Sequence, residues 1–340
     1  MSFGIHPEAA LSGPGVQEEF RRQIRAWSEL LARCARKPGQ KSVHRLRVAT
    51  LRLQAALEFS LSCMNAGSSS AKPAERWLRQ GKKLRRALGP VRQADVSLGK
   101  LASIKGCAEH APTAPAVFPK EYSGAIEKLE RTITRRRGAA AKKLVVEIEQ
   151  RRKRLTRLSR KLETDPACFL ATAQTGVADT IQSQMIAAAA GFSTLTIENL
   201  HEFRKRIKKI RYLAEVFAPL DPAAARQASM LKRMTAAAGE WHDWQALAEE
   251  AARADRKNTG AEAAAEFARA QARRSFEHAR TLCTRSIARM LKGAEEDRGR
   301  RGTSARKPDG QAQRKPVVSV SPVPNSTPAE RSVHASNLAS

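Results

Sequence analysis

The sequence VHRLRVATLRLQAALEF at residues 43–59 is matched by LHEFRKRIKKIRYLAEV at residues 200–216, which lies 157 residues further along the chain. At about 100° per residue, one narrow stripe of the first copy holds the residues suited to a core, namely Val43, Leu46, Thr50, Leu53 and Leu57. The equivalent stripe of the second copy consists of Leu200, Phe203, Ile207, Ile210 and, just beyond it, Phe217. Lysine, arginine and histidine cover the opposite face in both. Each copy therefore predicts an amphipathic helix with one apolar and one cationic face.

A second pair of similar segments follows the two copies in the same order. ALGPVRQADVSL at residues 87–98 resembles AGEWHDWQALAEE at residues 238–250, with Gly89 over Gly239 and Arg92 over His242. In the first pair, His44 falls on His201. Two linked matches in the same order indicate a duplicated helical unit whose halves are related by an approximate twofold axis.

The rest of the chain predicts an all-α protein with short unstructured ends. Between residues 17 and 297 the chain is rich in Ala, Leu, Arg, Lys and Glu, its apolar residues recur at helical spacing, and no stretch has the pattern of a strand. The segment from 298 to 340 is rich in Pro, Ser and Arg and has few large apolar side chains, so we expect it to be disordered. We therefore predict a flexible leader over 1–16, a folded region over 17–297 with halves of about 17–150 and 151–297, and a disordered basic tail.

The charge of the chain indicates a polyanionic partner. Its 62 Lys and Arg residues against 33 Asp and Glu give a formal net charge of +29, and such self-repulsion is relieved by binding a polyanion. Aromatic residues make up only 5% of the chain, which argues against a surface that stacks single-stranded bases. The five cysteines include no CxxC pair, and no segment has the pattern of a signal peptide or a membrane span, so we expect a cytoplasmic protein.

The four paired segments resemble those of the CHAD family, the conserved histidine α-helical domain. The resemblance covers roughly residues 17–297 and implies two four-helix bundles related by pseudo-twofold symmetry. It also implies a basic central surface that binds inorganic polyphosphate, with no catalytic activity and no cofactor, and an association with polyphosphate granules. One departure is Gln93, which stands where the family often has Asp after the arginine, although Asp95 remains.

The candidate polyphosphate-binding residues are the histidines and cations around these segments. They are His44, Arg45, Arg47, Arg52, Arg79, Lys82, Lys83, Arg86, Arg92, His201, Arg204, Lys205, Lys208, Arg211, Lys232, Arg233 and His242. Clustered Lys and Arg suit a chain of phosphates, which carries charge and no bases. We expect the histidines to donate to phosphate oxygens, with their protonation favoured by the polyanion. The alternative is a buried imidazole bonded to a facing helix.

Three other interpretations use the same residues. A run of charges is often only a solvated helix face, but here the cationic face has almost no acid for i,i+4 pairs and occurs twice. A nucleic-acid binder would carry the same net charge, although no known nucleic-acid-binding motif is present. A phosphorelay domain is an alternative because His44 and Arg47 loosely resemble HxxK, but Val48 stands where such domains place glycine.

His242 and Asp243 form an HD pair, as in some metal sites, but no other histidine has the spacing of a metal ligand, so no metal is predicted.

Overall fold

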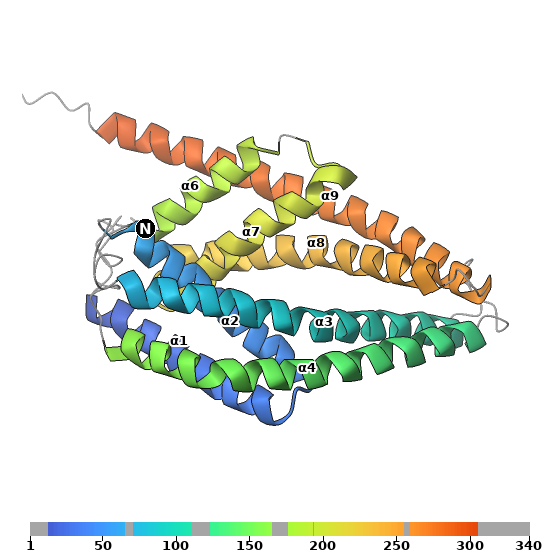
Figure 1. Ribbon diagram of the computed structural model, residues 1–340. Coiled ribbons are helices and arrows are strands. Elements are labelled where there is room, and N and C mark those ends of the chain that lie inside the picture. The colour runs from blue at the N-terminus through green and yellow to red at the C-terminus, as the bar shows by residue number, and fades with distance from the viewer. Residues whose placement is uncertain are drawn as a thin grey trace, which may run out of the picture. The chain divides into compact units, whose positions relative to one another are not determined.

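The computed structural model describes residues 13–64, 71–110, 123–164, 176–192, 194–254 and 259–304, and these ranges form eight helices with no strand (Figure 1). The all-α prediction is thereby confirmed. The helices are α1 (Gly13–Arg36), α2 (Gln40–Ser62), α3 (Ala71–His110), α4 (Ser123–Thr164), α6 (Val177–Ala190), α7 (Ile197–Phe217), α8 (Pro222–Ala254) and α9 (Thr259–Ser304).

The outer helices begin earlier and end later than the sequence predicts. α1 starts inside the predicted leader, where Pro14 occupies the first turn, a position that proline tolerates. α9 continues through residues 298–304, because no proline interrupts the chain before Pro308. The rest of the predicted leader and tail lies outside the described residues. The chain divides into two units, Met1–Gly293 and Ala294–Ser340, and the helix packing belongs to the first unit.

Helices α1 to α4 form a closed four-helix bundle, in which α1 packs on α2 and α4, and α3 packs on α2 and α4. Two fully buried tryptophans, Trp27 and Trp77, meet edge to face in its core with ring centroids 5.3 Å apart. Each indole N–H finds an acceptor: Trp27 donates to Thr50 Oγ1 at 3.0 Å and Trp77 donates to Ser159 Oγ at 3.2 Å. The core therefore buries large apolar rings without leaving their polar atoms unpaired.

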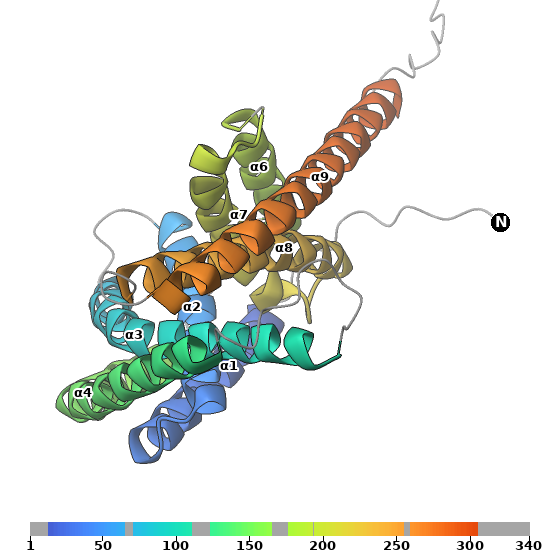
Figure 2. The same cartoon turned by 90° about the vertical axis from the view of Figure 1, so that its right-hand side faces the viewer.

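Helices α6, α7 and α8 pack on one another in the second half of the chain. α9 lies against α8 through two aromatic contacts, Trp241 with Phe276 at 6.3 Å and Trp244 with Phe267 at 6.2 Å between ring centroids. Figures 1 and 2 show α2 with α3 and α7 with α8 as adjacent layers, flanked by α1 and α4 on one side and by α6 and α9 on the other.

Helix α2 contacts α7, and two ion pairs join them in a reciprocal way. Arg52 of α2 pairs with Glu215 of α7 at 2.8 Å, and Lys209 of α7 pairs with Glu58 of α2 at 2.7 Å. The 157-residue shift places Arg52 on Lys209 and Glu58 on Glu215. Contacts between equivalent residues in both directions are what a twofold axis produces. The duplication itself stays a prediction that this reciprocity supports.

Candidate functional site

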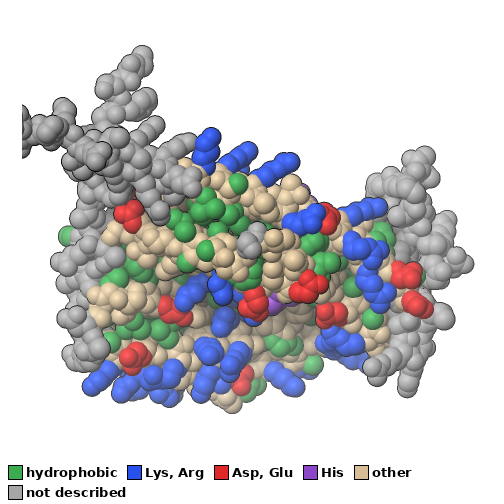
Figure 3. Space-filling model, turned by 90° about the horizontal axis from the view of Figure 1, so that it is seen from above, with side chains coloured by type: hydrophobic (Ala, Val, Ile, Leu, Met, Phe, Trp, Pro, Cys, Tyr) green, Lys and Arg blue, Asp and Glu red, His purple; other side chains and the backbone are tan. Residues whose placement is uncertain are grey.

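The cationic faces of α2 and α7 meet side chains of α3 and α8 in one group, which we call the central cluster. Their apolar stripes are buried, for example at Val43, Leu46, Leu200 and Phe203, so the opposite faces are left for charged residues. The cluster consists of six residues whose pKa is lowered here and two arginines, Arg92 and Arg211, whose charges contribute to that lowering; the six are His44, Arg47, His201, Arg204, Lys208 and His242. All eight belong to the predicted site, and both repeats contribute to it. Figure 3 shows Lys and Arg side chains, with some acidic residues and a histidine, in a band across the middle of one face.

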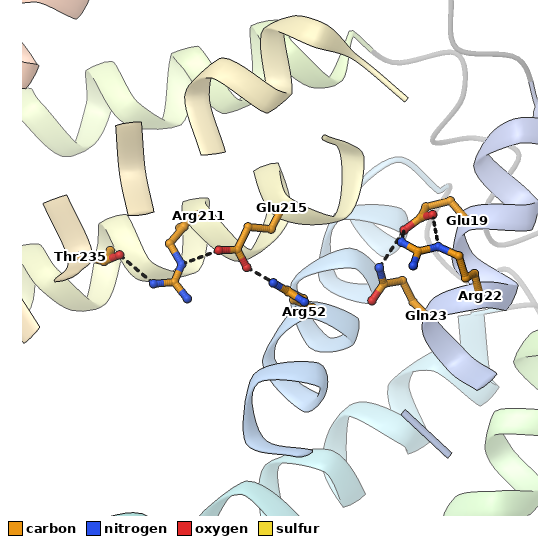
Figure 4. Close-up of polar contacts among 7 residues, drawn as sticks. All are labelled: Glu19, Arg22, Gln23, Arg52, Arg211, Glu215 and Thr235. Atoms are coloured by element: carbon orange, nitrogen blue, oxygen red, sulfur yellow. Dashed lines mark hydrogen bonds and ion pairs between the residues drawn. The ribbon is translucent and has the colours of Figure 1, made fainter. Parts of the chain in front are cut away.

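Two arginines of the central cluster are held in place by polar contacts. Arg47 donates from Nη1 to the backbone oxygen of Arg85 at 2.9 Å, which fixes it against α3. Arg211 donates from Nη1 to Thr235 Oγ1 at 2.8 Å, and its Nε lies 3.0 Å from Glu215 Oε1 (Figure 4). The other carboxylate oxygen of Glu215 accepts from Arg52 at 2.8 Å, so one acid is shared by two guanidiniums.

The buried Nε of Arg204 has no hydrogen-bond partner within the described part of the chain, and the same holds for Nε of Arg211 apart from its ion-pair contact with Glu215. The guanidinium of Arg204 lies over Gly239, where an added Cβ would be 3.9 Å from both Nε and Nη2. A buried donor without an acceptor destabilises the folded protein. Arg204 is therefore a donor that an anionic ligand can satisfy.

Burial and mutual repulsion lower the pKa of the titratable cations in the central cluster. Burial lowers the pKa of Lys208 to about 7, and the charges of Arg204 and Arg47 reinforce the effect. Burial, followed by Arg204, lowers the pKa of His242 to about 4. The pKa of His44 also falls, first through partial desolvation of its ring by the surrounding helices, although the residue keeps access to solvent, and then through the charge of Arg92. Without a ligand, these two histidines are neutral at pH 7, and Lys208 loses its proton at a much lower pH than an exposed lysine does. A bound anion would favour the charged forms.

The histidines are more open than a core position would leave them. His44 is exposed, while His201 and His242 are half-buried with ring centroids 5.0 Å apart. The exposure of His44 differs from the alternative of a buried imidazole, whereas His201 lies against His242 of the facing helix α8 and fits that alternative in part. Their position beside the arginines leaves ring nitrogens available to a ligand in the central cluster.

The remaining predicted residues lie around the central cluster in separate places. Arg45, Arg52 and Lys232 line, together with His44, a cleft of about 540 Å³ between α1, α2, α7 and α8. Lys83 and Arg86 line a groove of about 720 Å³ between α3 and α4. The others are exposed and line neither space, namely Arg79, Lys82, Lys205 and Arg233.

Helical geometry explains why the basic residues of α3 lie in two different places. Arg85 and Arg92 are seven residues apart and so share one face, and Arg85 receives the Arg47 contact. Lys83 and Arg86 lie on another face, toward α4. Arg85 is absent from the predicted site residues, although its spacing from Arg92 was an available signal.

The acids of the site were not predicted either. Glu215, Asp243 and Glu202 are carboxylates that interact with residues of the cluster, and burial raises the pKa of Asp243. Asp243 directly follows His242 in the sequence, and Glu215 was visible as the repeat partner of Glu58. Three acids among five Lys and Arg residues leave the cluster with a net positive charge.

No group of three or more His, Cys, Asp or Glu side chains that could hold a metal ion occurs in the described ranges. The helices within these ranges also lack the combination of length and apolar composition that crossing a bilayer requires.

Comparisons with known proteins agree with this architecture. The fold is similar to PptA from Streptomyces chartreusis, at 16% identity and a TM-score of 0.56 over 81% of this chain and 99% of that one. It is also similar to the CHAD domain from the plant Ricinus communis, at 18% identity and a TM-score of 0.53 over 84% and 95%. A search of curated proteins finds no match. The family model of the CHAD domain matches residues 18–252, more than half of the sequence, and the chain therefore belongs to the CHAD family.

Proposed function

We propose that this chain binds inorganic polyphosphate in the central cluster and catalyses no reaction on it. The observation that carries the proposal is the grouping of Arg47, Arg204, Lys208 and Arg211, all half-buried, from the two repeat helices. The family resemblance points to the same ligand. Such binding would place the protein at polyphosphate granules in the cytoplasm.

The free energy of binding would come from cations whose charge is poorly compensated in the free protein. Each charge-assisted hydrogen bond to a phosphate oxygen contributes about 1.5–3 kcal/mol. Arg204 brings an unpartnered donor, and Lys208 takes up a proton when a polyanion arrives because its pKa of about 7 rises. An unbranched phosphate chain can enter a half-buried cluster, whereas bases or a duplex would hold phosphates away from it.

The test is the double variant Arg47→Gln with Arg204→Gln, titrated with long-chain polyphosphate and with tRNA of equal total charge at two salt concentrations. Loss of two contacts is expected to weaken polyphosphate binding by about 100-fold or more and to reduce its salt dependence. Equal affinity for tRNA and polyphosphate at both salt concentrations would favour a non-specific nucleic-acid binder instead.

The control is His44→Gln with His201→Gln, which removes the histidines and leaves the arginines in place. Because the pKa of both histidines is lowered, we expect this variant to keep most of its affinity at neutral pH and to lose only the additional binding in mild acid. A phosphorelay protein would behave differently. An acid-labile phosphohistidine on the wild type that disappears in this variant would contradict simple binding.

A further inference from the structure

A second basic groove lies between α1 and α4, outside the residues predicted to bind polyphosphate. It has a volume of about 710 Å³ and is lined by five exposed cations of α4, namely Arg152, Lys153, Arg157, Arg160 and Lys161. Its other lining residues are small, apolar or hydroxyl-bearing: Ser28, Leu31, Ala32, Thr156 and Thr164. The lining contains no acid and no aromatic ring.

The cations of this groove repel one another along the helix. Arg157 has basic residues at all four positions where a helix brings side chains together, which are Lys153, Arg154, Arg160 and Lys161. Like charges at these spacings destabilise a helix. Arg152 lies 3.3 Å from Glu149, but the other four lining cations form no ion pair within the described residues. This run of like charges destabilises the folded helix, and an anionic ligand in the groove would relieve the repulsion.

The shape and lining of the groove define the class of that ligand. Packed helices have axes about 8–10 Å apart, so a groove between them admits a single chain and is too narrow for a nucleic-acid duplex. Single-stranded nucleic acid would find no aromatic ring on which to stack its bases. An unbranched chain of phosphates is narrow enough for the groove and has no bases that need an aromatic ring.

We infer that the groove between α1 and α4 is a second polyphosphate site and that long chains bind it and the central cluster at once, an inference that rests on the proposed function. In Figures 1 and 2, α4 lies on the opposite side of α2 and α3 from α7 and α8, and no residue of the groove lining belongs to the central cluster, so the two sites are distinct. A long chain that reaches both gains affinity through its high effective concentration at the second site. A chain too short to reach both sites gains nothing.

The test uses Arg157→Gln with Arg160→Gln, titrated with polyphosphate of about 10 units and of several hundred units, chosen to fall on either side of the length that spans both sites. The matched control is Arg269→Gln with Arg273→Gln, which removes two exposed charges from α9. We expect the groove variant to lose about tenfold in long-chain affinity and less than about twofold in short-chain affinity. The control should lose less than about twofold for both lengths, and Arg157→Lys with Arg160→Lys should restore most long-chain affinity.

Three outcomes would overturn the inference: an equal loss in the α9 control, an equal loss for short and long chains, or a loss for tRNA with none for polyphosphate. Failure of the proposed function is a separate result. It would appear as short-chain binding that Arg47→Gln with Arg204→Gln leaves unchanged, because short chains occupy the stronger central cluster before the groove.

Discussion

Replacing Lys208 with Met should stabilise the free protein while weakening its binding of polyphosphate. Lys208 lies half-buried among the charges of Arg47, Arg204 and Arg211, and this environment lowers its pKa from 10.5 to about 7. Methionine keeps most of the length of the side chain and removes the charge. The substitution therefore separates the packing of the side chain from its electrostatic cost.

The pKa of Lys208 gives the size and the pH dependence of the effect. At about 1.36 kcal/mol per pKa unit, the fall from 10.5 to about 7 corresponds to an upper limit of about 5 kcal/mol of destabilisation. Partial solvation should reduce this to about 2–3 kcal/mol. Because the pKa is lower in the folded state, the unfolded state binds more protons between pH 7 and 10.5. The advantage of Lys208→Met should therefore be full below pH 7 and disappear as the pH rises to 10.5.

The assay is urea unfolding of the wild type and the variant at pH 6, 8 and 10, with Lys205→Met as control. Lys205 is exposed on the same helix and pairs with Glu202, so its replacement should change the free energy of unfolding by less than about 1 kcal/mol. Polyphosphate affinity of Lys208→Met should fall about tenfold at neutral pH. A variant less stable than the wild type, or a difference that does not shrink with rising pH, would refute the idea that the central cluster is electrostatically strained.

Two further substitutions test the site and the core. Glu215→Gln should raise polyphosphate affinity about tenfold, because it frees the guanidiniums of Arg52 and Arg211. It should also lower the free energy of unfolding by about 1–3 kcal/mol, because the repulsion between the cations is no longer compensated. A fall in affinity on titration would contradict this. Gly81→Ala places a Cβ 2.8 Å from an indole carbon of Trp77 and should destabilise by about 1–3 kcal/mol in urea unfolding. A Cβ at Gly99 on the same helix meets nothing within 4 Å, so Gly99→Ala should be neutral or stabilising by up to about 1 kcal/mol. An equal change in the free energy of unfolding for the two variants would show that the close contact with Trp77 does not matter.

Helical periodicity was sufficient to predict which faces of α2 and α7 are buried, and so which of their residues can belong to the candidate site. The stripe that includes Leu46 and Leu53 in α2 is buried, as is the stripe that includes Phe203 in α7. Once these faces are fixed, Arg47 must lie at the edge of the buried stripe, where the structure leaves it half-buried. Equivalent positions in two similar helices also meet when those helices pack side by side, as α2 and α7 do.

The outer part of the site could not be predicted in the same way. α3 carries cations on several faces, so its sequence shows which residues are basic but not which helix each face meets. The structure turns Arg85 toward α2 and Lys83 toward α4, and this choice depends on tertiary packing. The lowered pKa of Lys208 has the same origin, because it follows from burial and from charges on α2 that are distant in sequence.

The central cluster and the α1–α4 groove differ in how far their cations are desolvated and ordered before a ligand binds. In the central cluster, folding has already removed part of the water from Lys208 and Arg204 and has oriented Arg47 and Arg211 through fixed acceptors. A ligand then gains the electrostatic attraction of a low-dielectric environment without ordering these side chains. In the α1–α4 groove the cations are exposed, so each contact is screened by solvent and must be ordered on binding. On the proposed function, the central cluster would therefore supply preorganised contacts at the expense of stability, and the groove would extend the bound length of chain through weaker, solvent-screened contacts.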